Sequence, residues 1–252
     1  MGKIRRVSTL LLLFAALLPG AVLAQELSHP ELLSGIKTVT SPGEAEEWLR
    51  YYYKHPRPDL ALSALKVIET DARIQQQFAL LPVSAFVAQI FRANPDLAPQ
   101  AVRQLRSNIG RQLMLYAVWL SGLDSSTELL EEIKKGADER IARAAKEMMY
   151  RVPPDFLKDA VDSPTTVEAL WGSYFASGDR RYVEKIASVL PLKNRSDEAD
   201  SAIGIAAQDT LMLALARDPD LKPILETRLK TASAEEKPVL AEVIAKAASG
   251  TR

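Results

Sequence analysis

Short amphipathic segments, separated by prolines and glycines, follow one another along most of the chain. In residues 44–54 the apolar and aromatic side chains recur at three- and four-residue spacing, which gives one apolar stripe on a helix. Ser41 and Pro42 favour a helix start before this segment, and Pro56 and Pro58 end it. Similar runs are expected at residues 58–70, 72–80, 83–93, 97–107, 110–121, 126–135, 137–150, 155–161, 165–177, 180–190, 199–217, 219–231 and 235–248. No stretch alternates apolar and polar residues as a strand requires, so the sequence predicts an all-α fold.

One of these helix starts is repeated in the chain. Residues 91–105 align without gaps on residues 215–229, and both contain Pro-Asp-Leu between two helical runs. Pro-Asp-Leu also stands at 58–60, and the variant Pro-Asp-Phe at 154–156. Proline has a preset φ at a helix start and the aspartate meets the positive end of the helix dipole, so the element could recur without common origin. The alternative is a true repeat of helical hairpins, for which we expect an irregular α-solenoid of stacked antiparallel helical hairpins.

A family resemblance rests on two strings in the second half of the chain. WGSYF at residues 171–175, followed by GDRRYVEKI at 178–186, resembles a degenerate tetratricopeptide or HEAT-like helical-repeat hairpin, with Gly172 where two helices approach closely. The regular alanine and closing proline positions of a fixed-period repeat are missing. Together with residues 48–58, these strings are also similar to a group of exported bacterial helical-repeat proteins. The resemblance implies stacked helices and no particular activity.

The start of the chain has the pattern of a secretory signal peptide, expected over residues 1–24. Positive charges are followed by an apolar run at 7–18, and Val22 and Ala24 occupy the −3 and −1 positions. We therefore expect cleavage after Ala24 and a periplasmic or secreted mature protein. The apolar run is shorter than the about 20 residues of a membrane-spanning helix, so an uncleaved anchor is the alternative. No later segment approaches that length.

Removing this segment defines the mature chain. We expect a short lead segment at 25–40 and a single all-helical, repeat-like domain at 41–252, with a possible sub-boundary near 152–154. The whole chain is formally neutral, and the signal peptide carries an excess of positive charge, so the mature part is slightly acidic. Its charges are interspersed and form no basic stripe, which excludes the usual nucleic-acid surface. The chain has no cysteine, which excludes disulfides and thiolate metal sites.

Motifs of catalysis and metal binding are missing from the sequence. His29 and His55 are the two histidines, and no pair of histidines has the spacing of metal ligands. There is no Gly-x-Ser-x-Gly and no glycine-rich phosphate loop. We therefore expect no metal, no cofactor and no motif-based catalytic residue. A pair of catalytic carboxylates needs no local motif and stays open.

An aromatic cluster near the first helix is the candidate binding site. Aromatic faces beside a guanidinium can anchor a peptide or stack on a sugar. The alternative is that Trp48, Tyr51 and Tyr52 pack against the next helix. A second cluster, formed by Trp171, Tyr174, Phe175 and Tyr182, has the same two interpretations, and packing is preferred there. The candidate binding residues are Trp48, Tyr51, Tyr52, Tyr53, His55 and Arg57.

Two functions fit these patterns. The first is an exported, non-catalytic protein-interaction module of the cell envelope, a scaffold or adaptor that binds a protein or peptide. The second is a carboxylate-based hydrolase or lyase that acts on cell-wall or other polysaccharide, with the aromatic clusters as sugar platforms. Buried tryptophans and a shallow groove favour the first function. A deep cleft with two facing carboxylates beside exposed Trp48 or Trp171 favours the second.

Overall fold

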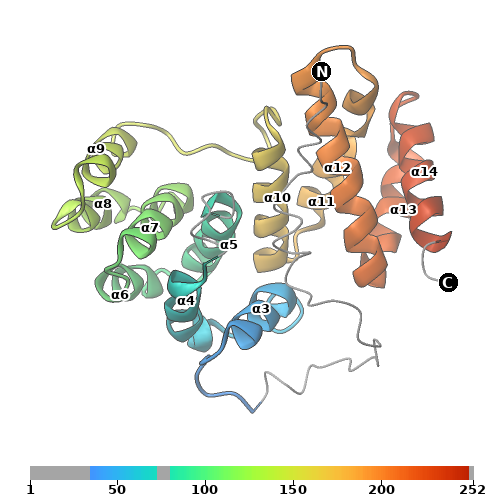
Figure 1. Cartoon of the computed structure of the whole chain (residues 1–252). Helices are drawn as coiled ribbons and strands as arrows, with labels where there is room; N and C mark the ends of the chain where they lie inside the picture. Colours follow the sequence, from blue (N-terminus) through green and yellow to red (C-terminus); the bar gives the residue numbers. More distant parts are fainter. Residues whose placement is uncertain (1–34, 73–79, 250–252) are drawn as a thin grey trace. The chain divides into compact units, whose positions relative to one another are not determined.

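The computed structural model describes residues 35–72 and 80–249 (Figure 1). In this part of the chain it has twelve α-helices and no strand, so the predicted all-α fold is confirmed. The predicted signal peptide and the first ten residues of the lead segment lie outside the described residues. None of the helices described is both long enough and apolar enough to cross a bilayer. The stacking of helical hairpins into one solenoid stays a prediction.

The chain is divided into two compact units. Among the described residues, the N-terminal unit comprises 35–72, 80–154 and 172–178, and the C-terminal unit comprises 155–171 and 179–249. The first change of unit therefore follows Pro154, directly after two consecutive prolines. The second divides one helix, α10 (Pro164–Ser177), between the units.

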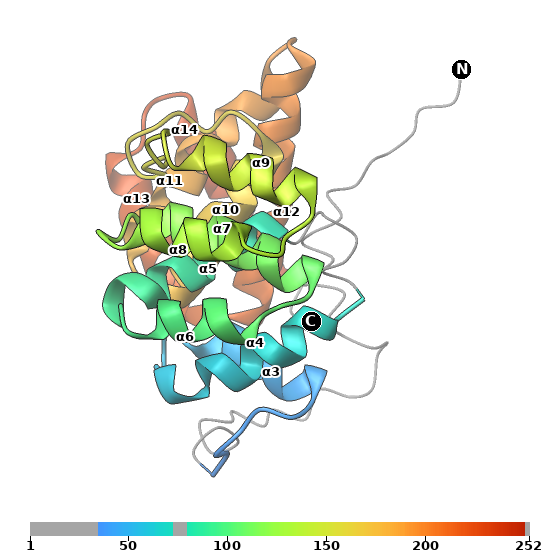
Figure 2. The ribbon, with the colours of Figure 1, turned by 90° about the vertical axis from the view of Figure 1, so that its left-hand side faces the viewer.

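The N-terminal unit is built around two helices, α5 and α7, which make the most extensive contact in it. Their buried side chains include Phe86, Phe91 and Leu113. In Figure 2, α3 lies at the lower end of this unit and α9 at its upper end. Its elements are α3 (Pro42–Tyr51), the 3-10 helix η1 (Pro58–Leu60), α4 (Ala61–Thr70), α5 (Leu80–Ala93), α6 (Leu97–Gln104), α7 (Asn108–Ser121), α8 (Ser126–Lys134) and α9 (Glu139–Met148).

The sequence signals at the ends of these helices are used as expected. Ser41 caps α3, its hydroxyl accepts a hydrogen bond from the amide of Glu44, and the Glu44 carboxylate binds back to the Ser41 amide, which completes a capping box. Pro42 occupies the first helical position, where its missing amide proton is not needed. The C-terminal end of α7 is set by Gly122, which has φ +60° and ends the helix in the left-handed conformation.

The C-terminal unit is centred on its longest helix, α12 (Glu198–Arg217). Gly204 in α12 lets the backbone of the preceding 3-10 helix approach closely, because a Cβ there would lie 2.0 Å from the Lys193 nitrogen. The remaining elements are the first half of α10, α11 (Arg180–Ser188), η3 (Leu190–Asn194), η4 (Pro219–Leu221), α13 (Lys222–Thr231) and α14 (Glu236–Ser249).

The repeated Pro-Asp-Leu element has the same structure at two of its positions. At Pro58 and at Pro219 it forms a three-residue 3-10 helix that leads into a helix of ten residues. The predicted helix at 155–161, after Pro-Asp-Phe, is wrong. The chain forms one turn there, in which the amides of residues 158 and 159 donate to the Asp155 carbonyl. Most of its side chains are exposed, so no apolar stripe stabilises further turns. The predicted helix at 72–80 falls mostly outside the described residues.

Candidate functional site

The aromatic cluster of α3 is divided between the core and the surface. Trp48 is fully buried and Tyr52 is 4% exposed. Their rings and that of Phe86 from α5 meet edge to face, with centroids 5.2 to 5.5 Å apart. This geometry is favourable for aromatic rings, and the three rings form part of the core of the N-terminal unit. Trp48 and Tyr52 are therefore packing residues.

The two aromatic clusters of the sequence meet at Tyr53. This half-buried ring lies 5.0 Å from the ring of Tyr174 and 6.0 Å from that of Phe175, measured between centroids. Gly178, with φ +67, lies against the Tyr53 side chain. Trp171 and Tyr182 are buried as well. The packing interpretation of the second cluster is thus confirmed for its buried members.

Besides the half-buried Tyr53, two further predicted binding residues keep accessible surface at the end of α3. Tyr51 is half-buried, with the Arg50 guanidinium 5.9 Å from its ring centroid, and His55 is exposed. Lys54 lies between them in sequence, with its ammonium 5.4 Å from the Tyr53 ring centroid. We call Tyr51, Lys54 and His55 the α3-end surface.

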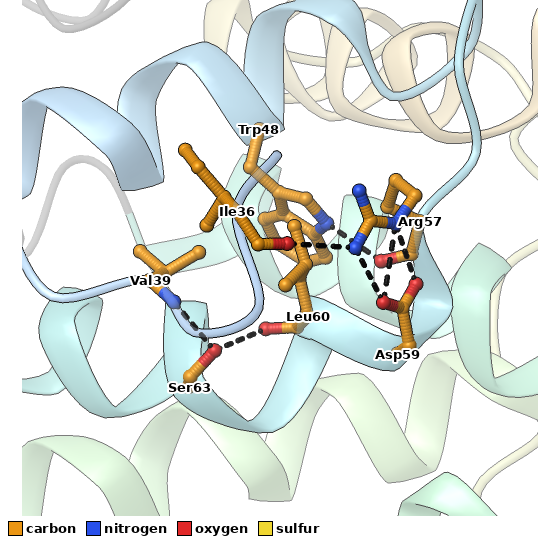
Figure 3. A network of polar contacts seen from close by, with 7 residues as sticks. All are labelled: Ile36, Val39, Trp48, Arg57, Asp59, Leu60 and Ser63. Carbon is orange, nitrogen blue, oxygen red and sulfur yellow. Dashed lines mark hydrogen bonds and ion pairs between the residues drawn. The ribbon is translucent and has the colours of Figure 1, made fainter. Parts of the chain in front are cut away.

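Arg57 acts within the N-terminal unit through both its backbone and its side chain (Figure 3). Its carbonyl accepts a hydrogen bond of 3.0 Å from the indole Nε1 of Trp48. Its guanidinium binds both carboxylate oxygens of Asp59, with 2.9 Å from Nε to Oδ1 and 2.6 Å from Nη2 to Oδ2. These hydrogen bonds lower the pKa of Asp59 and raise that of Arg57. The same Nη2 donates to the backbone carbonyl of Ile36 at 2.9 Å.

Residues 36–40, which we call the strap, are hydrogen-bonded to side chains of the α3–α4 region. The amide of Val39 donates to the hydroxyl of Ser63 at 3.0 Å, and that hydroxyl donates to the carbonyl of Leu60 at 2.9 Å (Figure 3). The amide and hydroxyl of Thr40 both donate to one carboxylate oxygen of Glu44. The strap is non-helical, and its Val39 side chain is 3% exposed. The contacts of Ile36 with Arg57 and of Val39 with Ser63 were not predicted, because these residues are far apart in the chain.

The C-terminal unit has a cavity of about 360 Å³. Two of its lining cations are already paired. Arg181 binds Asp179, and Arg228 binds Glu236 through two bonds of 2.7 Å. Among the described residues that line it, Glu184 is the one carboxylate, so they do not present the two facing carboxylates of a glycosidase. It is lined by Leu157, Arg181, Glu184, Lys185, Ser188 and Arg228.

Two buried glutamates were not among the predicted site residues. Glu168 in α10 is 8% exposed, its carboxyl carries no hydrogen bond to any described residue, and burial raises its pKa to about 7. Glu168 stands in an otherwise apolar run of the sequence, and this isolated charge was the pattern from which its burial could have been predicted. Glu69 in α4 is buried too, and burial alone would raise its pKa. Hydrogen bonds from Ser107 and Lys66 outweigh that effect, so the pKa of Glu69 is lowered.

Within the ranges described, no group of three or more histidine, cysteine, aspartate or glutamate side chains could hold a metal ion. Comparisons of the chain with family models, with curated proteins and with solved structures give no significant match. Of the predicted binding residues, Trp48 and Tyr52 lie in the core, and the Arg57 backbone is bonded to Trp48. Tyr51 and Tyr53 are half-buried, and His55 is exposed.

Proposed function

We propose that this protein is an exported, non-catalytic interaction module of the cell envelope, which binds a protein or peptide partner. One observation carries the proposal over its polysaccharide-cleaving alternative. Trp48 and Trp171, the tryptophans of the two aromatic clusters, are 0% and 4% exposed. A sugar platform needs an open aromatic face, and neither of these rings offers one.

The contact surface that we propose is the α3-end surface. Tyr51 and His55 keep accessible aromatic and polar surface there, whereas the half-buried Tyr53 ring contacts Tyr174 and Phe175. Tyrosine is enriched in interface centres because it buries much apolar area at a low entropic cost and keeps a polar tip. The Arg50 guanidinium near the Tyr51 ring adds a cation at the edge of this surface.

A pull-down of the mature protein from the envelope fraction, read out by mass spectrometry, tests this proposal. We expect reproducible partners with the wild type and their loss with the double substitution Tyr51→Ala and His55→Glu. Tyr150→Ala is the matched control. Tyr150 is 83% exposed and lies in the same unit, outside the α3-end surface. Reproducible absence of any enriched protein, or equal loss in the control, would contradict the proposal.

A further inference from the structure

The strap is held in the way that a bound peptide is held. Side chains of the α3–α4 region bind its backbone, since Arg57 donates to the Ile36 carbonyl and Ser63 accepts from the Val39 amide. One strap side chain, Val39, is buried, while Lys37 and its neighbour at 38 are exposed. Peptide grooves divide their recognition in the same manner, with backbone hydrogen bonds for affinity and a side-chain pocket for selection.

The receiving side chains are positioned by contacts that do not involve the strap. The carboxylate of Asp59 accepts hydrogen bonds from Nε and Nη2 of Arg57, which fixes the orientation of the guanidinium. The Ser63 hydroxyl donates to the Leu60 carbonyl, which leaves its lone pairs available for an incoming amide. The surface is therefore preorganised for a backbone carbonyl and an amide three residues apart.

We propose that this surface, formed by the Arg57 guanidinium, the Ser63 hydroxyl and the buried site that receives the Val39 side chain, is a peptide-binding groove that the strap occupies in cis. Its partner in trans is a short non-helical peptide segment of another protein, with a branched aliphatic residue at the position of Val39. The inference goes beyond the α3-end surface to a second site, and it rests on the proposed function for the existence of a partner. The groove itself can be tested without one, because the strap sequence serves as the ligand.

The covalent link gives the strap an advantage over any free peptide. A tethered segment competes at an effective concentration on the order of millimolar. A peptide in solution therefore binds the intact protein weakly, and binds well when the strap no longer fits. This difference is the measurable sign of a groove that is occupied in cis.

The test measures the affinity of a fluorescent peptide of residues 35–42 for the full mature chain by anisotropy. Val39→Asp in the protein places a carboxylate in the buried strap position and leaves the groove residues unchanged. We expect the peptide to bind this variant at least about tenfold more tightly than the wild type. Adding Ser63→Ala should weaken that binding about fivefold, because one hydrogen bond is lost. The same peptide carrying Val39→Asp should not bind.

The proposed groove is contradicted if the peptide binds the wild type and the Val39→Asp variant equally tightly, or binds neither of them. A circular dichroism melt shows whether the variant is folded. If it is not, a measurement on the native groove decides instead. The chain has no cysteine, so Lys37→Cys places a single fluorophore on the exposed side of the strap.

Excess unlabelled peptide of residues 35–42, at millimolar concentration, should displace the labelled strap and lower its anisotropy. The Val39→Asp peptide should leave the anisotropy unchanged. No response to either peptide, or the same response to both, overturns the groove. Neither outcome touches the pull-down result, since a partner could still bind at the α3-end surface. Failure of the groove and failure of the proposed function are thus distinguishable.

Discussion

The indole Nε1 of Trp48 donates a hydrogen bond of 3.0 Å to the backbone carbonyl of Arg57. This bond joins the most buried aromatic residue of α3 to the loop that carries the Arg57–Asp59 pair. It makes Trp48 a structural residue with a polar contact as well as an apolar one. A substitution of Trp48 is therefore expected to lower the stability of the fold, whether or not it changes binding.

Trp48→Phe is expected to lower the free energy of unfolding by about 2 kcal/mol, because the part-buried Arg57 carbonyl loses its donor. Trp119→Phe is the matched control. Its Nε1 also donates to a backbone carbonyl, that of Arg151, at 3.0 Å, but water can replace that exposed bond. We expect a loss below about 1 kcal/mol there. Urea denaturation measures both, and equal losses would refute the structural role of Trp48.

Gly172→Ala is expected to destabilise the N-terminal unit. Its Cβ would lie 2.1 Å from the carbonyl oxygen of Pro82, and a backbone atom cannot move aside cheaply. We expect a loss of about 2 to 3 kcal/mol. Gly43→Ala in α3 is the control, since a Cβ there meets nothing within 4 Å and alanine favours the helix. A Gly172→Ala protein as stable as the wild type would contradict the close approach of α10 and α5.

The buried Glu168 predicts a dependence of stability on pH. Burial raises its pKa to about 7 from 4.5, so the folded state holds the proton more tightly than the unfolded state does. Stability therefore falls as the pH rises from about 4.5 to about 7, and the loss is about 3 kcal/mol. Glu168→Gln removes this loss. Compared with the wild type, it should unfold at higher urea concentration at pH 8 and at a similar concentration at pH 4. A variant less stable than the wild type at pH 8 would show that the carboxylate is stabilised in the fold.

The ion pair between Arg228 and Glu236 joins α13 to the first turn of α14. Glu236 is 3% exposed, and its two oxygens accept two bonds of 2.7 Å from the guanidinium. Glu236→Gln leaves a partly buried cation without its counter-charge, so we expect a loss of about 2 to 3 kcal/mol. The control is Glu139→Gln in the exposed pair with Arg143, where the change should stay within about 0.5 kcal/mol. Thermal melts of both variants measure the difference, and similar shifts would show that the Arg228 pair is no stronger than a surface pair.

Much of the fold could be predicted from local signals. Ser41 and Pro42 start a helix because their chemistry acts within one turn, and helix periodicity identified most of the other helices. The helix predicted at 155–161 was wrong because the same Pro-Asp start needs an apolar stripe after it, and the side chains there are mostly exposed. The closeness of Gly172 to another helix was also predicted, because glycine in an apolar helical run has few other uses.

The candidate site could be predicted only in part. Aromatic spacing placed Trp48 and Tyr52 on one stripe, but their burial depends on Phe86 of α5, which local sequence does not reveal. Arg57 was among the predicted binding residues, but its bonds to Asp59 and to the Ile36 carbonyl were not predicted. Such long-range contacts of the backbone leave no pattern in a single sequence.

Photo-crosslinking at the α3-end surface tests the central claim most directly, namely that this surface binds a partner protein. A benzoylphenylalanine at position 51, in the full chain in its source cells, should give one reproducible protein adduct on illumination. The same probe at position 150, the more exposed tyrosine, should not give that adduct. An adduct from position 150 with none from position 51, or none from either, would contradict the account.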